Sequence, residues 1–528
     1  MRDFDQPGRS PVIAENGMAA TSHPLATATA LAVLKEGGNA VDAAIAASAT
    51  LCVVEPHMTG IGGDCFVILA EPDGTVHGLN GSGRAPAASD PAWYRDNGFA
   101  SMPQTGVHAV TAPGAVDAWS RLIARFGTMG FDRLFADAIR YAEEGFAVHA
   151  RVARDWALHV PALRGDRGAA IHCLLDGEAP AAGTRFRFPA LGATLRAIAK
   201  DGARAFYEGE IAAEMAATVR GQGGFLSEED LAAVAADWVA PLSVSYGGYD
   251  VLEIPPSGQG VTALILLRLM EAHGIGKLPT GSAERYHMEI EAARLAYSVR
   301  DHLVSDPATM TRTPEELLSD SFILALGAQL SSERRNPSVV LPEMARSDTV
   351  YLTVVDRDRR AVSFINSVYS AFGSKVVTPR SGIALQNRGG CFTLEEGHPN
   401  ELGGGKRPMH TIIPAMAMKN GRAAVSFGVM GGDYQPMGHA HVFSNLVDHG
   451  MDPQEALDHP RLFWGDDGVL DAEGGIPAQI RSDLVARGHQ VRDAGAPHGG
   501  GQMIVIDDEN GFLVAGSDPR KDGCALGW

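Results

Sequence analysis

The sequence predicts an α/β protein with antiparallel strands towards both ends of the chain. Helical patterns dominate residues 115–340, whereas short apolar or alternating runs bounded by turn residues occur before and after them. The clearest pair, 349–355 and 361–367, flanks the charged turn 356–360 and is typical of a β-hairpin.

The first elements follow from local signals. Residues 24–36 have the periodicity of an amphipathic helix that ends at two glycines. Asn39 can cap a second helix, 40–52, whose small residues allow close packing, and Pro56 ends it. Strands are expected next, joined by a Pro-Asp-Gly turn, at 65–70 and 75–79.

The helical middle is interrupted twice. A loop rich in Gly, Asp and Ala is expected at 165–182, and 242–254 resembles a strand that leads into a helix at 261–273. Further strands are expected at 423–428, 503–506 and 512–515, and helices near 435–449 and 453–459. Because no repeat or low-complexity linker occurs, a cut near residue 348 would fall within one domain.

Bulk composition restricts the class of protein. The 528 residues, 45% hydrophobic and 20% charged, are typical of a globular protein larger than one simple core. The net charge of −19 argues against nucleic acid and anionic membranes as partners. Five cysteines without metal-like spacing favour a reducing compartment. With no signal-like start and no apolar stretch that could span a bilayer, we expect a cytoplasmic location.

Thr349 has two interpretations. It is an ordinary strand residue, or it is a nucleophile that becomes active when the Asp348–Thr349 bond is cut. The cut would give Thr349 a free α-amine, whose pKa of about 7.7–8.0 suits a general base beside the hydroxyl. Ser367 on the paired strand could donate a hydrogen bond to Thr349. Spacing alone favours two ordinary strand hydroxyls.

Two glycine-rich turns are also ambiguous. Gly431 and Gly432 lie between an expected strand and a helix, where they could form an oxyanion hole or simply adopt positive φ. Residues 59–63 lack the Gly-Lys-Ser/Thr ending of a phosphate loop, so close backbone packing is the simpler explanation.

Basic side chains supply candidate anion sites. Arg84 and Arg388 each lie beside glycine in a short turn, where a guanidinium can bind a carboxylate, although a lone arginine is usually just solvated. His410 lies beside a motif and is therefore a candidate site residue, although a histidine with a purely structural role is the more common case. His439 and His441 do not share a helical face and have no third ligand, so no metal is expected.

Together these segments make the chain resemble the γ-glutamyltranspeptidase family of N-terminal nucleophile hydrolases over nearly its whole length. The matching segments are 37–44, 59–63, 110–114, 348–349 with 354–356, 372–373 and 431–432.

The resemblance implies a four-layer αββα sandwich in which the precursor cleaves itself into residues 1–348 and 349–528, both within one structural domain. These two fragments would form a heterodimer, or a pair of heterodimers. It further implies that Thr349 attacks an amide of a small molecule to form an acyl-enzyme, that Ser367 supports Thr349, and that Gly431 and Gly432 form the oxyanion hole. No metal or organic cofactor is implied.

Departures from the family pattern concern the acyl group. Ser82 stands where the family has its carboxylate-binding arginine, with Arg84 two residues away, and His410 and Thr411 replace a pair of serines. The family's Asn, Gln and Asp for the substrate α-amine align here with Tyr369, Arg388 and Cys391. Losing the Asp and gaining a cation disfavours an ammonium group.

A small acyl group with a carboxylate and no amine is therefore expected, as in the branch of the family that contains oxamate amidohydrolase. Arg84 or Arg388 would bind the carboxylate, with Tyr369, His410 and Thr411 around it. The alternatives are a γ-glutamyltransferase or glutathione hydrolase with a rebuilt pocket, and, in another class, a non-catalytic scaffold or binding protein.

Overall fold

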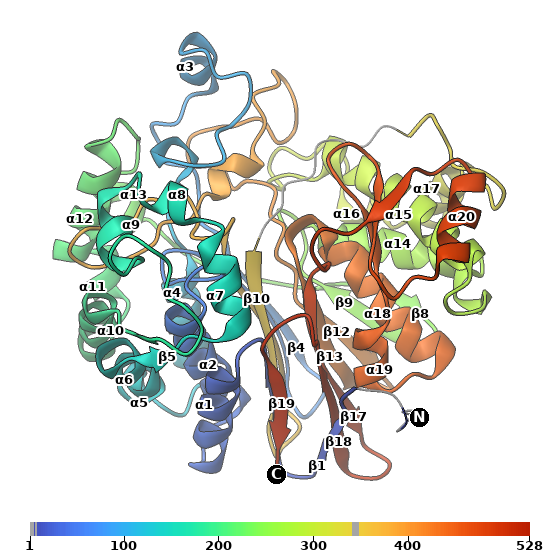
Figure 1. The fold of residues 1–528 in the computed structure, drawn as a ribbon, viewed down its shortest axis with the longest axis horizontal. Coiled ribbons are helices and arrows are strands. Elements are labelled where there is room, and N and C mark those ends of the chain that lie inside the picture. The colour runs from blue at the N-terminus through green and yellow to red at the C-terminus, as the bar shows by residue number, and fades with distance from the viewer. Residues whose placement is uncertain (1–4, 6–7, 340–347) are drawn as a thin grey trace.

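Two seven-stranded antiparallel sheets pack face to face in the computed structural model, with helices on both outer sides (Figure 1). The structure describes residue 5, residues 8–339 and residues 348–528. The strands of the first sheet, sheet A, are in order β1 (Val12–Ala14), β18 (Phe512–Ser517), β17 (Gly500–Asp507), β13 (Arg422–Met430), β12 (Ala415–Lys419), β9 (Tyr249–Glu253) and β8 (Leu242–Tyr246). Those of sheet B are β19 (Cys524–Gly527), β2 (Met18–Thr21), β10 (Asp348–Val355), β11 (Ala361–Tyr369), β3 (Asp64–Ala70), β4 (Val76–Gly81) and β7 (Asp237–Val239).

Helices cover the outer face of each sheet. On sheet B, α1 (Pro24–Lys35) packs against β2 and the edge strand β19, α2 (Ala40–Val54) against the central strands β10 and β11, and α4 (Ala115–Phe126) against β3 and β4. On sheet A, α14 (Gly260–Ala272), α18 (Gln435–His449) and α19 (Pro453–Asp458) do the same. Figure 1 shows the resulting α-β-β-α order from left to right, which confirms the expected four-layer sandwich.

Shorter elements surround these layers. Two small sheets contain β14 (Leu462–Trp464), β15 (Leu470–Ala472) and β16 (Val491–Asp493), and β5 (Phe146–Ala147) with β6 (Arg185–Phe186). The remaining α-helices are α3 (Pro91–Asp96), α5 (Phe131–Leu134), α6 (Ala136–Glu144), α7 (Ala150–Ala157), α8 (Val160–Leu163), α9 (Arg167–His172), α10 (Pro189–Asp201), α11 (Arg204–Tyr207), α12 (Gly209–Arg220), α13 (Glu228–Ala232), α15 (Ala283–Leu303), α16 (Pro314–Leu317), α17 (Asp320–Gly327) and α20 (Ala478–Ala486). No helix of the described residues is both long and apolar enough to cross a bilayer.

The expected hairpin is present as β10 and β11. Every residue of β11 is buried, because the hairpin lies between the helical layer and sheet A. Alternate hydroxyls of β10 face sheet A, where Thr353 Oγ1 lies 2.6 Å from Ser426 Oγ of β13. Thr349 lies at the start of the same strand, where the pairing with β11 is irregular.

Two local expectations were wrong in detail. The expected loop at 165–182 contains the short helix α9, which Asp166 caps by accepting a hydrogen bond from Ala169 N. The single strand expected at 242–254 is the hairpin of β8 and β9, joined by two glycines with positive φ. Asn39 does cap α2, through a capping box with Asp42.

Candidate active site

Thr349 is fully buried and lies beside Ser367, as the hairpin predicted. The pairing of β10 with β11 contains a bulge, since Asp348 is opposite Tyr369 but Val350 is opposite Asn366. Such an extra residue re-aims side chains, and bulges are common beside active sites. Thr349 Oγ1 donates to Ser367 Oγ at 3.1 Å, so the direction of the hydrogen bond is opposite to the one expected. The side chain of Asp348 lies outside the described part of the structure.

Ser367 Oγ is an acceptor that gathers several donors. Besides Thr349, the backbone amide of Tyr369 donates to it at 2.8 Å and Arg388 Nη2 at 3.3 Å. Tyr369 has φ +80, a conformation that costs a non-glycine residue on the order of 1–3 kcal/mol. The bond from its amide to Ser367 helps to hold this conformation at the end of β11.

Arg388 is the cation of this cluster and is completely buried. Its Nη1 donates to Thr411 Oγ1 at 2.7 Å, and its guanidinium carbon lies 4.3 Å from the centre of the Tyr369 ring. Its Nε has no acceptor among the described residues. A short 3-10 turn, Arg388–Cys391, brings the side chain to the end of the hairpin.

No carboxylate of the described residues lies within 4.0 Å of the Arg388 guanidinium. The nearby Cys391 Sγ, 3.9 Å from Nη1, is not an anion, because burial raises the pKa of the thiol. Burial likewise raises the pKa of Tyr369 well above its ordinary value. Asp433 is held by Arg300, at 2.6 Å. The described groups in direct contact with the Arg388 guanidinium are therefore neutral.

His410 and Asp64 support this arrangement from behind. Ile412 N donates to His410 Nδ1 at 3.3 Å, so Nε2 carries the proton that faces Asp64 Oδ2 at 2.9 Å. Burial, and then the charge of Arg388, lowers the pKa of His410 to about 4, so the ring is neutral near pH 7. Both ring nitrogens thus have protein partners. The expected role of His410 in contacting substrate stays a prediction; in the structure its ring connects Asp64 to the backbone of Ile412.

Asp64 was missed by the sequence reasoning. Its Oδ1 accepts hydrogen bonds from the amides of Gly83 and Gly114 and from the side chain of Gln386. Asp64 is also the β3 residue directly opposite Ser367. Its position immediately after the glycines of 59–63 was the available signal.

Gly431 and Gly432 follow β13 and have φ values of +123 and +59, which residues with a side chain rarely adopt. Neither amide has a hydrogen-bond acceptor among the described residues. Gln259, which the sequence analysis did not identify, fixes this turn, because its Nε2 donates to Thr411 O at 2.6 Å and to Gly432 O at 3.0 Å. Gln259 Oε1 is in turn held by Arg300. The turn therefore belongs to the same cluster as Thr411 and Arg388.

Arg84 lies apart from this cluster. Its side chain is 48% exposed, and its Nη1 lies 3.1 Å from Gly405 O and 3.9 Å from Asp306. Its contacts in the described part of the chain include none of the residues around Thr349. Of the two candidate arginines, Arg388 is the one that the fold brings to the threonine.

The glycines of 59–63 are explained by packing. A Cβ on Gly63 would lie 2.2 Å from the carbonyl oxygen of Ser367, and one on Gly62 would lie 2.2 Å from that of Ala384. The loop thus presses against the strand that carries Ser367, in agreement with the packing interpretation rather than a phosphate loop.

Histidines elsewhere have structural partners. His439 lies 2.7 Å from Glu253 and His441 lies 2.9 Å from Glu289. Among the described residues, no group of three or more His, Cys, Asp or Glu side chains is arranged to hold a metal ion.

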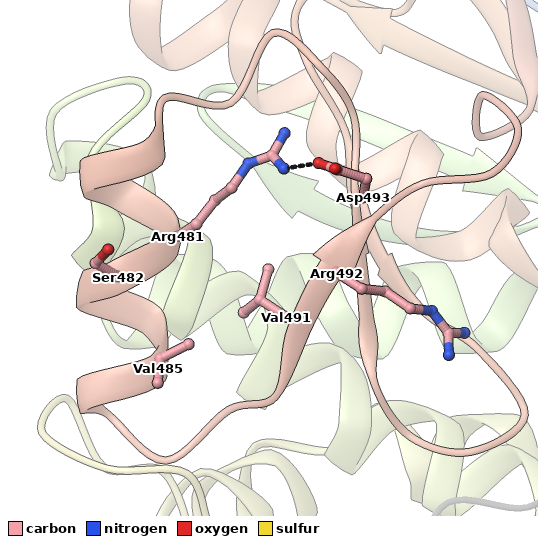
Figure 2. Close-up of a pocket in the computed structure, with 6 residues that line it drawn as sticks. All are labelled: Arg481, Ser482, Val485, Val491, Arg492 and Asp493. Atoms are coloured by element: carbon pink, nitrogen blue, oxygen red, sulfur yellow. Dashed lines mark hydrogen bonds and ion pairs between the residues drawn. The ribbon is translucent and has the colours of Figure 1, made fainter.

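Two hollows differ in their relation to this cluster. A cavity of about 400 Å³ is lined by Gly431 and by neighbours of the cluster, Ser370, Met430 and Asp433. A second hollow, of about 380 Å³, lies between α20 and β16, where Arg481 pairs with Asp493 (Figure 2). The second hollow shares no residue with the threonine cluster, so we connect only the first with Thr349.

Comparison with known proteins identifies the family. The model of the γ-glutamyltranspeptidase family matches residues 26–528. The chain belongs to the γ-glutamyltranspeptidase family. The protein is therefore an enzyme of the N-terminal nucleophile type, an amidohydrolase or acyltransferase made as a self-processing proenzyme. The non-catalytic alternative is not retained.

Relatives within the γ-glutamyltranspeptidase family carry different names. The glutathione hydrolase-like YwrD proenzyme of Bacillus subtilis is 36% identical, covering 98% of this chain and 99% of that protein. The oxamate amidohydrolase proenzyme of Klebsiella pneumoniae is 34% identical over the same shares. The crystal structure of cephalosporin acylase from Bacillus halodurans is 39% identical, with a TM-score of 0.93 over 100% of this chain and 99% of that one.

The close contact at Gly63 yields a first prediction. Gly63→Ala should displace Ser367 and destabilise the fold by about 1–3 kcal/mol, as overpacking does, and amide hydrolysis should fall at least about tenfold with it. Gly60→Ala is the matched control, since a Cβ there would meet its nearest neighbour at 3.4 Å. Thermal unfolding and steady-state kinetics measure both effects; equal behaviour of the two variants would contradict the packing argument.

The low pKa of His410 yields a second prediction, which concerns the pH dependence of stability. Because this pKa is about 4 in the folded chain and 6.5 ordinarily, the unfolded chain binds more protons between these values. The associated stability is present above pH 6.5 and is lost as the pH falls towards 4. When the pH falls from 7 to 5, the free energy of unfolding should decrease less for His410→Gln than for the wild type, by on the order of 1–2 kcal/mol. Urea unfolding at both pH values measures this difference. The exposed His302→Gln should behave like the wild type; a His410 variant that does so too would contradict the prediction.

Proposed function

We propose that this enzyme cuts its own chain between Asp348 and Thr349 and then hydrolyses the amide of a small substrate that bears a carboxylate and no α-ammonium group. The observation that carries the substrate proposal is Arg388, a buried guanidinium 3.3 Å from Ser367 Oγ with no carboxylate partner among the described residues. An uncompensated buried charge is costly, so a site that keeps one is suited to a ligand of opposite charge.

Self-cleavage would leave the fold in place. Sheet A and sheet B each contain strands from before and after Thr349, so the two fragments would remain interleaved as a heterodimer. The new α-amine would form beside the Thr349 hydroxyl, which already has an acceptor in Ser367. The proenzyme names of the relatives support this step.

The proposed reaction has two stages, formation of the acyl-enzyme and its hydrolysis. The α-amine of Thr349 takes the proton of Oγ1, and Oγ1 attacks the amide carbon. The amides of Gly431 and Gly432 stabilise the negative oxygen, and the ammonium returns its proton to the departing amine. Water, activated by the same amine, then releases the acyl group and restores Thr349.

Charges around Arg388 favour an oxamate-like acyl group over a γ-glutamyl group. Its guanidinium can pair with a carboxylate, and Thr411 and Tyr369 help to orient it. A substrate ammonium would meet the same cation, since Cys391 and Tyr369 are neutral and Asp433 is paired with Arg300. The name of the oxamate amidohydrolase relative agrees with this proposal.

Glutathione hydrolysis or γ-glutamyl transfer is the second candidate, because the relative at 36% identity is named glutathione hydrolase-like. A structural neighbour is named cephalosporin acylase, so amides with acyl groups longer than that of oxamate are tested as well. A panel of oxamate, glutaryl amides and γ-glutamyl-p-nitroanilide separates these candidates. Efficient turnover of the γ-glutamyl compound alone would overturn the proposed acyl group.

The nucleophile is tested by Thr349→Ala. The variant should remain a single chain on denaturing gels and show no amide hydrolysis, because it lacks the attacking oxygen in both steps. The wild type should give two bands whose N-terminal sequencing places the cut before Thr349. A wild type that is active but uncut by mass spectrometry would refute the mechanism.

The carboxylate site is tested by Arg388→Gln. Loss of a charge-assisted hydrogen bond, about 1.5–3 kcal/mol, should lower kcat/KM for oxamate by about 10- to 100-fold. The uncharged acetamide should be affected much less. Arg84→Gln tests the other candidate arginine and should change kcat/KM by less than about threefold; the reverse ranking would assign the carboxylate to Arg84.

A further inference from the structure

We infer that Gln259 is a positioning residue of the oxyanion hole, which fixes the direction of the Gly431 and Gly432 amides and thereby the rate of the chemical step. The inference rests on the proposed function, because it takes these two amides as the groups that stabilise the negative oxygen of the intermediate. It adds a residue that acts through backbone carbonyl groups, and it states which kinetic constant that residue controls.

Two consecutive glycines need outside support to keep one conformation. Glycine adopts positive and negative φ about equally well, so Gly431 and Gly432, at φ +123 and +59, have no side chain that selects this geometry. An oxyanion hole depends on donors that are aimed before the reaction, since donors that must reorient during the reaction lose much of their benefit. The contacts that hold the turn therefore determine how well its amides can act.

The peptide groups on both sides of Gly432 are held by hydrogen bonds. Gly431 O accepts from the amide of Tyr434 at 3.1 Å, and Gly432 O accepts from Gln259 Nε2 at 3.0 Å. Because a peptide group is planar, the direction of the Gly431 carbonyl also sets that of the Gly432 N–H. The Tyr434 contact lies within the turn itself, whereas Gln259 is 173 positions away in the chain and joins the turn to another part of the fold.

Arg300 of α15 sets the direction of the Gln259 side-chain amide. A guanidinium only donates hydrogen bonds, and Arg300 Nη1 lies 2.8 Å from Gln259 Oε1. The NH₂ group must then face the other way, where the carbonyl oxygens of Thr411 and Gly432 accept from it at 2.6 and 3.0 Å. Gln259 and Arg300 are 0% and 2% exposed, so these bonds form in a medium of low dielectric constant, which strengthens them.

The same NH₂ group joins the two halves of the site. The Thr411 hydroxyl accepts from Arg388, the proposed carboxylate-binding cation, at 2.7 Å. Because Gln259 binds both Thr411 O and Gly432 O, it fixes the distance between this cation and the turn. A substrate bound by its carboxylate would then have its amide oxygen placed against the turn, and such prior alignment lowers the barrier of the chemical step.

The first test is the split between kcat and KM in Gln259→Met, which removes both hydrogen bonds. With oxamate, kcat per self-cleaved chain should fall about 10- to 100-fold because the amides are no longer aimed, whereas KM should change by less than about threefold because Arg388 is unaltered. Gln259→Glu keeps the shape of the side chain and an acceptor for Arg300 but loses the donor. It should show the same split, and it guards against a folding failure of the first variant.

Gln454→Met is the matched control. Gln454 is also buried, at 3% exposure, and its Nε2 donates to a backbone carbonyl, that of Ser517, at 2.9 Å. It lies on α19, and its side-chain hydrogen bonds go to Asp458 and Ser517 rather than to the oxyanion turn. This variant should keep the wild-type kcat and KM.

The second test compares oxamate with its thioamide analogue, in which sulfur replaces the amide oxygen. Sulfur is a weak hydrogen-bond acceptor and gains little from an oxyanion hole. The ratio of kcat/KM for the amide to that for the thioamide should therefore fall at least about tenfold in both Gln259 variants. It should keep its wild-type value in Gln454→Met. A general loss of structure would lower both rates equally and leave the ratio unchanged.

The outcomes separate the inference from the proposed function. Gln259 variants that keep the wild-type ratio would overturn the inference alone, whatever their kcat. A wild type whose ratio equals that of uncatalysed alkaline hydrolysis would overturn the oxyanion hole at Gly431 and Gly432, and the inference with it. If the wild type cleaves only γ-glutamyl amides, the proposed acyl group fails, and a γ-glutamyl amide with its thioamide decides the inference instead.

Discussion

The pairing of β10 with β11 is the constraint on which the site depends. Its bulge brings Thr349 Oγ1 to 3.1 Å from Ser367 Oγ, and its end leaves Tyr369 in a left-handed conformation. The loop of Gly62 and Gly63 presses on the far side of β11, where any side chain would collide with the backbone. A hydroxyl that is to act as a nucleophile needs such fixed geometry, because small displacements of reacting atoms cost large factors in rate.

Around this hairpin lies a buried positive charge, Arg388, that has no carboxylate partner in the part of the chain that the structure describes. Arg388 is held through Thr411, which is flanked by the His410–Asp64 pair and by Gln259. Each polar neighbour is itself hydrogen-bonded, which limits the cost of burying the group. The result is a pre-organised cation beside Thr349, the proposed nucleophile, and the proposed preference for a carboxylate over an ammonium group rests on this cation.

Much of the fold could be predicted from the sequence because its signals are local. Asn39 caps α2, two glycines end α1, and alternating residues around a charged turn form the β10–β11 hairpin. The short strands β1, β2 and β19 could not be predicted in this way, since three or four residues carry too little pattern. They form only because neighbouring strands supply their hydrogen bonds.

The residues of the candidate site likewise fall into those that local sequence signals identify and those that they do not. Thr349, Ser367, Gly431 and Gly432 could be named from motifs and their resemblance to a family, because their chemistry is carried by residue type and chain position. Asp64 and Gln259 could not, since a polar residue beside glycines has no local mark of its partners. The choice between Arg84 and Arg388 also needed the fold, because both have the same local setting.

The sequence by itself determined the α/β class, the hairpin, the candidate nucleophile and the family resemblance, all of which depend on residue type and spacing along the chain. Only the tertiary structure decided which arginine lies beside the threonine, and that its charge has no carboxylate partner among the described residues. The physical reason is that charge compensation and cavity shape are sums over neighbours in space. Residues hundreds of positions apart, such as Asp64 and His410, set them together.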